Sequence, residues 1–473
     1  MTTTTICGGP RWLAGLALTL LPVGPGGPNP TFGAILDEDD EESADADEDE
    51  DAEDRPEWFA VVGGDVHTGT GSVLRGATVV SKDGEIVAIG YDPWFPEDAG
   101  TLDATGYHVY PGLVAINSFG LFGGGSDLEN SVNPFNRNMI LALAAGITTA
   151  FSGGEIEDVV IGTNPFTDLT YGTGNPSAKR STREKLEKAA DYLRRYHQWE
   201  IDKRSDDDLK EPSKKDVDES YVKVLRGQTR AAFSASSRTD LLEIARLAQR
   251  FGFRPLIRGC REGWVVADEL GRAGASAIVT PRDRRPKDET LVREGGSSIE
   301  NAALLHAAGV SITILPSSQG ISLGGIVGRD LMHLPVEAGF AIRGGLPEDA
   351  ALRGITIEPA RLLGVDHRIG TLEVGKDADM IVTDGDVLHY QTFVQWAVVD
   401  GKLVYDKQAE LYFAHIRPRP ESSLAPLERV DAGESPPETE ADDLEEGEDD
   451  GGDGDPEDPG EDDGSEDGGD GPR

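Results

Sequence analysis

Short apolar runs alternate with helical segments through the middle of this chain, and this alternation limits the possible folds more than any other feature of the sequence. The runs are rich in Val, Ile and Ala and have the length of buried strands. One helical segment, 238–250, carries an apolar face at helical spacing, made of Leu241, Leu242, Ile244, Ala245 and Ala248. Alternation over about 250 residues is typical of a (β/α)8 TIM-like barrel of the α/β class. We expect strands at 109–119, 148–151, 159–161, 231–235, 254–257, 275–279 and 311–315, and helices at 238–250, 264–273, 298–308 and 347–363.

Two groups of short β segments flank this alternating region. The first group, within 58–102, has a hairpin turn at Lys82-Asp83-Gly84, and the second, around 379–405, again has Asp-Gly at a turn. Because the two groups lie at opposite ends of the α/β region, we predict one small composite β-sandwich domain formed by both flanks. The predicted bounds are 58–108 and 366–412 for this domain, and 109–365 for the barrel.

A polar stretch at 176–222 interrupts the alternation. It is rich in Lys, Arg and Asp, which predicts a helical insertion in the barrel with a mobile loop around 205–218.

Acidic side chains are concentrated near both ends of the chain. Residues 37–54 hold 14 of the 87 acidic side chains and residues 421–470 hold 23, so 55–420 has a formal charge of only about −9 within the total of −43. Such segments repel themselves too strongly to collapse, and we expect a disordered acidic linker at 35–57 and a disordered acidic tail at 419–473. These tails can attract cations or basic proteins. No concentrated basic surface is left for a phosphate backbone, which argues against nucleic-acid binding.

Residues 1–34 have the pattern of a secretory signal peptide. Arg11 precedes an apolar run from Trp12 to Leu21, and a stretch rich in Pro and Gly follows. The run is too short to span a bilayer comfortably. We therefore expect export to the periplasm or the extracellular space, with Phe32-Gly33-Ala34 as a candidate cleavage site and no membrane association after signal removal.

Several motifs follow one another in a fixed order across residues 59–408. They are Asp103 to Gly106, Pro111-Gly112-Leu113, Ala145 to Thr149, Asp349 to Gly364, Ile369 to Val382 and Val399 to Lys402. In this order and at these separations the chain resembles the amidohydrolase superfamily, and within it the imidazolonepropionase-like branch. The resemblance implies a barrel with a β-sandwich flank. In active members it also implies hydrolysis of C–N bonds, in amides or cyclic amides, by a water bound to zinc or another divalent metal.

The positions that hold the metal in this family carry other residues here. The family has a His-x-His pair at the end of the first barrel strand, a His on each of the fifth and sixth strands, and an Asp on the eighth. The equivalent positions are Asn117 and Phe119, the segment Ser234 to Ser237, Gly259, and the segment Pro316 to Ser318. Amide and hydroxyl groups are poor ligands for transition metals, so we predict neither a metal site nor another cofactor.

The remaining histidines and cysteines add no ligand set. No two of the eight histidines have the spacing of a metal site, and we expect them to be isolated structural or surface residues. They are His67, His108, His197, His306, His333, His367, His389 and His415. Of the two cysteines, Cys7 lies in the predicted signal segment and Cys260 is expected to be an inert buried thiol.

Three functions are compatible with these observations. The first is a catalytically degenerate, exported amidohydrolase that acts as a binding or scaffold protein. Polar groups at the barrel mouth would then either bind a small-molecule ligand or only satisfy one another and solvent: Asn117, Ser234, Ser236, Arg258 and Arg282. The second is an active hydrolase whose site is rebuilt from Glu155, Asp158, Glu262 and Asp283. The third is an interaction protein that works through its acidic tails.

Overall fold

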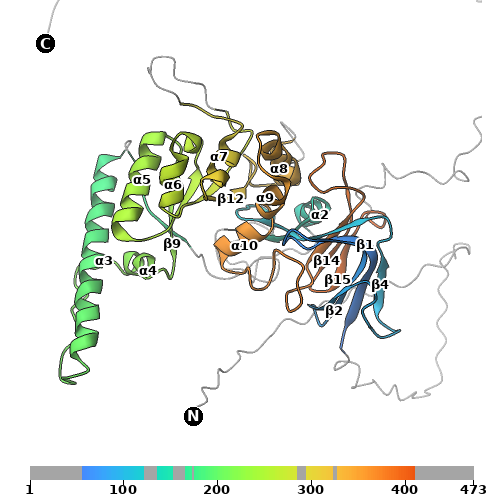
Figure 1. Cartoon of the computed structure of the whole chain (residues 1–473), viewed down its shortest axis with the longest axis horizontal. Coiled ribbons are helices and arrows are strands. Elements are labelled where there is room, and N and C mark those ends of the chain that lie inside the picture. Colours follow the sequence, from blue (N-terminus) through green and yellow to red (C-terminus); the bar gives the residue numbers. More distant parts are fainter. Residues whose placement is uncertain are drawn as a thin grey trace, which may run out of the picture.

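A computed structural model describes residues 56–121, 136–152, 166–172, 175–284, 295–322 and 328–410. Figure 1 shows the strands β1, β2, β4, β14 and β15 at one end of the molecule and the helices α3 to α6 at the other. No helix of the described segments is long and apolar enough to cross a bilayer. The predicted signal segment, the acidic linker, the acidic tail and the predicted strand 159–161 lie outside the described residues.

Strands from both flanks of the chain form one eight-stranded sheet. Its order is β15-β14-β13-β5-β1-β2-β3, and β4 also pairs with β1. The two flanks meet where β13 runs antiparallel to β5, with Met380 opposite Pro111. The separated β segments predict that both flanks contribute to one domain, and in the structure both contribute strands to this sheet. The predicted domain is a β-sandwich, whereas these strands belong to a single sheet. The strands are β1 Trp58–His67, β2 Val73–Lys82, β3 Glu85–Gly90, β4 Gly100–Asp103, β5 His108–Pro111, β13 Met380–Thr383, β14 Val394–Val399 and β15 Lys402–Asp406.

The single strand predicted at 109–119 is wrong, because the chain breaks at Gly112. Residues up to Pro111 belong to β5, whereas β6, Leu113–Ala115, pairs with β7, Ile147–Ala150. The backbone N–H of Gly112 donates to Asp379 (3.0 Å) and the next one, Leu113, donates to Gly146 (2.9 Å). Gly112 also lies against Thr148, whose Oγ1 would be 1.9 Å from an added Cβ. The glycine thus lets consecutive residues join two different sheets.

The middle of the chain supplies parallel strands. Five of them form a sheet in the order β12-β11-β10-β9-β8, and β6 and β7 form a separate pair. The strands are β8 Phe166–Asp168, β9 Arg230–Ala235, β10 Pro255–Gly259, β11 Ser276–Val279 and β12 Ser311–Ile314. β8 was not expected from the sequence, because three residues are too few for a periodic pattern.

Contacts on both sides connect these parallel sheets. On one side, Ile314 of β12 donates to the carbonyl of Gly354 (2.9 Å) and Val114 of β6 donates to that of Ile355 (2.8 Å). On the other side, the rings of Phe151 and Phe166 meet edge to face at 5.9 Å. The arrangement is mixed α/β and consistent with a TIM-barrel-like fold, although no continuous ladder of hydrogen bonds closes it within the described residues.

The same contacts explain why the helix predicted at 347–363 is wrong. Two helices, α9 and α10, stand in its place, and the residues between them supply the carbonyls that accept from β12 and β6. The prediction for α5 is confirmed, since Leu241, Ile244, Ala245 and Ala248 are buried. The helices are α2 Arg137–Ala144, α3 Pro176–Asp202, α4 Glu219–Leu225, α5 Arg238–Phe251, α6 Ala267–Arg272, α7 Asn301–Ala307, α8 Leu334–Arg343, α9 Glu348–Arg353 and α10 Ile357–Leu363, with 3-10 turns η2 Gly263–Val266 and η3 Leu331–His333.

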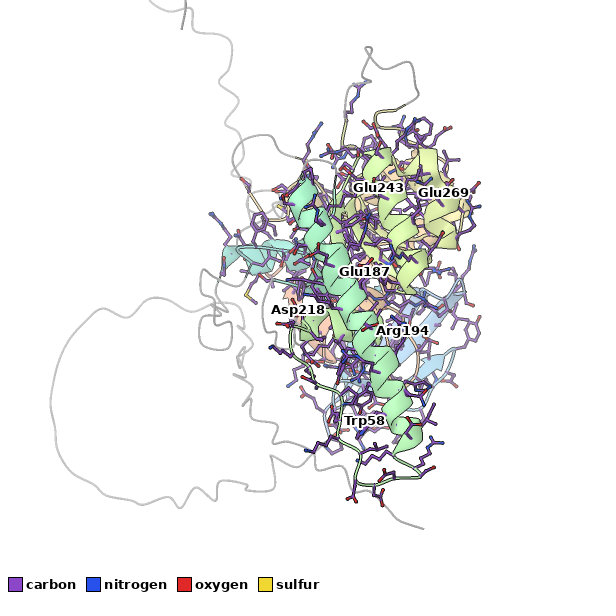
Figure 2. The ribbon with its side chains drawn as sticks, turned by 90° about the vertical axis from the view of Figure 1, so that its left-hand side faces the viewer. Trp58, Glu187, Arg194, Asp218, Glu243 and Glu269 are labelled. Carbon is purple, nitrogen blue, oxygen red and sulfur yellow. The ribbon has the colours of Figure 1, made fainter. Side chains whose placement is uncertain are left out.

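The polar stretch at 176–222 contains α3 and most of α4. Figure 2 shows α3 as a long helix along one side of the molecule, with Glu187 and Arg194 on it. Its buried residues, which include Leu186, Ala189 and Tyr192, face the rest of the fold. Glu187 forms an ion pair with Arg250 of α5 at 2.9 Å. The helix is therefore a packed part of the fold.

Candidate functional site

The carboxyl ends of the parallel strands, where the sequence places the candidate site, are bridged by Asn117. This residue follows β6, and its Nδ2 donates to Oε1 of Gln319, which follows β12, at 2.6 Å. The backbone N–H of Phe119 donates to the carbonyl of the same Gln319 at 3.0 Å. The ring of Phe119 is 59% exposed. Asn117 therefore joins two strand ends, and its amide nitrogen already has a partner.

Two of the predicted residues, Ser234 and Arg258, are brought together. They are direct partners in the parallel pairing of β9 and β10, so their side chains share one face of the sheet. Asp168 of β8 is opposite Ala232 and lies on the same face. Arg258 forms an ion pair with Asp168, and its guanidinium lies 5.5 Å from the centre of the Phe166 ring. Ser234 is exposed beside this pair.

Asp168 is a residue of this site that the sequence did not reveal. It lies 90 positions from Arg258, in a strand too short to be recognised. Only the register of three neighbouring strands places the two side chains together, and no local pattern carries that register.

Ser236 lies next to Gly259, at the end of β10. Gly259 has a φ of +94°, and an added Cβ would lie 2.9 Å from Oγ of Ser236. The left-handed backbone and the close hydroxyl both disfavour any larger side chain there. A histidine at the place of Gly259 would therefore need a different local backbone.

Arg282, the fifth predicted residue, forms an ion pair with Glu337 of α8. Its Nε donates to Oε2 of Glu337 at 2.6 Å, and its backbone N–H donates to Oε1 of the same carboxylate at 2.8 Å. Glu337 lies on α8 and is only 1% exposed. The guanidinium also lies 5.0 Å from the centre of the Phe340 ring. This largely buried ion pair connects the segment after β11 to α8, and the ligand contact predicted for Arg282 stays a prediction.

The carboxylates proposed for a rebuilt site are also engaged. Glu262 accepts from the backbone N–H groups of Arg238 and Gly296, both at 2.8 Å. Asp283 forms an ion pair with Arg261. Glu155 and Asp158 lie outside the described residues.

The described side chains at the family's ligand positions do not form a set that fits a divalent metal. Those positions hold an amide, an exposed ring, hydroxyls and a glycine, and Oγ of Ser317 approaches the carbonyl of Arg329 at 3.5 Å. Within the described ranges, no group of three or more His, Cys, Asp and Glu side chains could hold a metal ion.

The expectation that the histidines are isolated is wrong for His67 and His108. Nε2 of His67 lies 3.0 Å from Nδ1 of His108, and the His67 ring stacks on Tyr110 at 4.1 Å. The pair forms because β1 and β5 run parallel with Asp65 beside His108. Burial, followed by the neighbouring His108, lowers the pKa of His67.

The burial predicted for Cys260 is confirmed. The side chain is fully buried, and this burial raises the pKa of its thiol to about 12. A thiol with so high a pKa is protonated near neutral pH and is a poor nucleophile.

Comparisons with known proteins agree with the fold. The model of the amidohydrolase family matches residues 275–409. A solved amidohydrolase from Thermotoga maritima MSB8 has a TM-score of 0.54 and 22% identity, over 74% of this chain and 100% of that one. At this identity the likeness concerns the fold alone.

Curated relatives match over short stretches. Amidohydrolase tasK of Hapsidospora irregularis is 33% identical over 94 residues, which are 20% of this chain and 10% of that protein. Urease subunit alpha of Yersinia pestis (strain Pestoides F) is 38% identical over 108 residues, 20% of this chain and 18% of that protein. The chain thus spans less than a fifth of the length of these two relatives.

The fold is mixed α/β and consistent with a TIM-barrel-like arrangement. The family match over 275–409 supports a place in the amidohydrolase superfamily, and the likeness to a solved amidohydrolase agrees with it at the level of the fold.

Proposed function

We propose that this protein is a catalytically degenerate member of the amidohydrolase superfamily that acts as a binding or scaffold protein. The observation that carries the proposal concerns the positions that correspond, by resemblance, to the family's metal ligands. The amide of Asn117 ties β6 to the segment after β12, and Gly259 has a φ of +94°. Asn117 thus connects two strand ends, and Gly259 fixes the backbone conformation at the end of β10.

The binding role rests on the face shared by Ser234, Arg258 and Asp168. The Arg258 side chain is 32% exposed, and its only described ion pair is with Asp168, a more exposed carboxylate. A small ligand with a carboxylate or amide oxygen could replace Asp168 on the guanidinium and accept from the Ser234 hydroxyl. The proposed ligand is therefore a small polar molecule. Arg282 is no longer part of this proposal, because Glu337 holds it.

Three further assignments remain proposals that rest on sequence alone. They are export of the protein, the attraction of cations or basic proteins by the acidic tails, and membership of the imidazolonepropionase-like branch. The first two concern residues outside the described ranges.

The experiment is a hydrolysis assay of the full chain on a panel of amides and lactams, with and without added zinc or manganese. We expect no turnover above background under either condition. Turnover that added metal restores and a chelator removes would contradict the proposal. Turnover that is lost in both E262Q and D283N but kept in E348Q, a change at an exposed glutamate, would favour the rebuilt hydrolase instead.

A further inference from the structure

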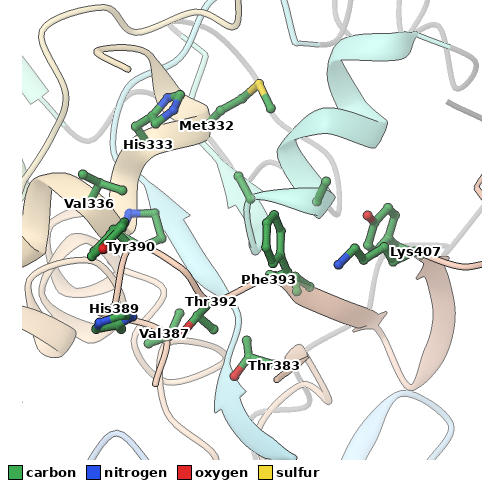
Figure 3. A pocket seen from close by; sticks show the side chains of 15 residues that line it. Met332, His333, Val336, Thr383, Val387, His389, Tyr390, Thr392, Phe393 and Lys407 are labelled. Carbon is green, nitrogen blue, oxygen red and sulfur yellow. The ribbon is translucent and has the colours of Figure 1, made fainter. Parts of the chain in front are cut away.

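A cavity of about 240 Å³ lies away from the strand ends, between the helices and the composite sheet. Its walls come from the end of α2, from η3 and α8, from the segment between β13 and β14, and from the end of β15. Figure 3 shows Phe393 and Lys407 on one side and His333 and Val336 on the other. Ligand sites occur preferentially at such junctions between parts of a fold.

The charge of this cavity differs from that of the chain. The protein has a formal net charge of −43, yet none of the described residues that line the cavity is Asp or Glu. A second cavity of about the same volume, beside His67, is lined by Glu348, Asp349 and Asp386. Of these two cavities, the first is therefore the better suited to a negatively charged ligand.

Among the lining residues that the structure describes, Lys407 is the only lysine or arginine. Its ammonium group lies 4.1 Å from the centre of the Phe393 ring and is in no ion pair with another described residue. An ammonium group that lies on a ring face and pairs with no described carboxylate can pair with an anionic group of a ligand.

The rest of the lining is largely apolar. Val336 and Val387 contribute aliphatic walls, and the rings of Tyr390 and Phe393 are 73% and 54% exposed. Large exposed rings beside a cavity favour an apolar occupant that removes them from water.

His333 gives the cavity one fixed polar group. Its Nδ1 lies 2.7 Å from Oδ1 of Asp330, a buried carboxylate, and this contact orients the ring. With the proton on Nδ1, Nε2 remains a hydrogen-bond acceptor. The hydroxyls of Thr383 and Thr392, in contrast, already donate to the carbonyls of Gly385 and Asp386.

We propose that this cavity binds a small organic anion with an apolar body, whose charged group pairs with Lys407 and whose body lies against Phe393 and Val336. The site is separate from the strand ends and does not depend on the function proposed above.

The test uses the full chain and three probes of similar shape: benzoate, benzamide and benzylamine. Affinities are measured by ligand-observed NMR at low and at high salt. We expect benzoate to bind most tightly, and K407Q to weaken benzoate about fivefold without changing benzamide, as expected for one partly exposed charge pair. High salt should weaken benzoate on the native protein but not on K407Q.

The matched control is K402Q. Lys402 is an exposed lysine of β15 that pairs with Glu57 and does not line the cavity. Its substitution should leave all three affinities unchanged. The proposal is overturned if no probe binds, if benzylamine binds as well as benzoate, or if K407Q and K402Q have the same effect.

Discussion

Arg282 and Glu337 show how one residue can suit a binding site by type and still belong to the scaffold. The pair is largely buried, and Nη2 of Arg282 has no hydrogen-bond partner among the described residues. Breaking a buried pair on one side leaves an uncompensated charge, which is costly.

We therefore predict that E337Q lowers the free energy of unfolding by about 3 kcal/mol. Urea unfolding followed by circular dichroism measures the change, with E348Q at an exposed glutamate as control. If E337Q unfolds at the same urea concentration as E348Q, the ion pair does not hold α8 to the end of β11.

Asp379 is a buried carboxyl that connects stability to pH. Burial raises its pKa to about 7, although Oδ1 accepts from the backbone N–H of Asp400 at 3.0 Å. Because its folded-state pKa lies above the unfolded value, the folded protein binds the proton more tightly. Asp379 thus contributes a loss of stability as pH rises from about 4 to about 7.

In D379N this contribution is absent, because the amide stays neutral and can still accept from Asp400. We predict that D379N is more stable than the native protein at pH 8 and that the difference shrinks toward pH 4. Thermal unfolding across this pH range tests it, with D98N at an exposed aspartate as control. A difference that does not vary with pH would show that Asp379 does not titrate in this range.

At the residue scale, the sequence could nominate chemical types but not partners. Asn117 and Arg282 are candidates because their side chains are polar, but in the structure these side chains donate to Gln319 and Glu337. These partners lie 202 and 55 positions away. Such pairs follow from strand register and helix docking, which have no local pattern.

At the scale of elements, the break at Gly112 separates the two parts of the fold. The predicted strand 109–119 was continuous because its apolar run is continuous, and periodicity alone cannot show that consecutive residues join different sheets. The strands β9 to β12 and helix α5 were predictable, since each has a clear apolar pattern. The helix predicted at 347–363 failed because Gly354 and Ile355 bond to strand edges.

We predict that G112A lowers the free energy of unfolding by about 1–3 kcal/mol or more, because the added Cβ would meet Thr148. G90A is the control, since nothing lies within 4 Å of a Cβ added there. Denaturant unfolding of both variants gives the comparison. Equal stability of the two would mean that the close approach to Thr148 does not restrict this position.

At the scale of the whole molecule, the acidic excess and the candidate site lie in different parts of the chain. Most of the acidic excess lies in 37–54 and 421–470, outside the described residues. The described part has a fold supported as amidohydrolase-like, and its strand ends are tied together by Asn117, Gln319, Arg258 and Asp168. The order of the motifs made the fold predictable. The contacts of Asn117 with Gln319 and of Arg258 with Asp168 could be identified only in the structure.

We propose that this fold no longer maintains a metal centre, and the metal content of the protein tests this proposal most directly. The full chain is purified without chelators, incubated with zinc or manganese, desalted and analysed by inductively coupled plasma mass spectrometry. The account predicts a content far below one ion per chain for both metals. One tightly held zinc or manganese ion per chain, retained through desalting, would contradict it.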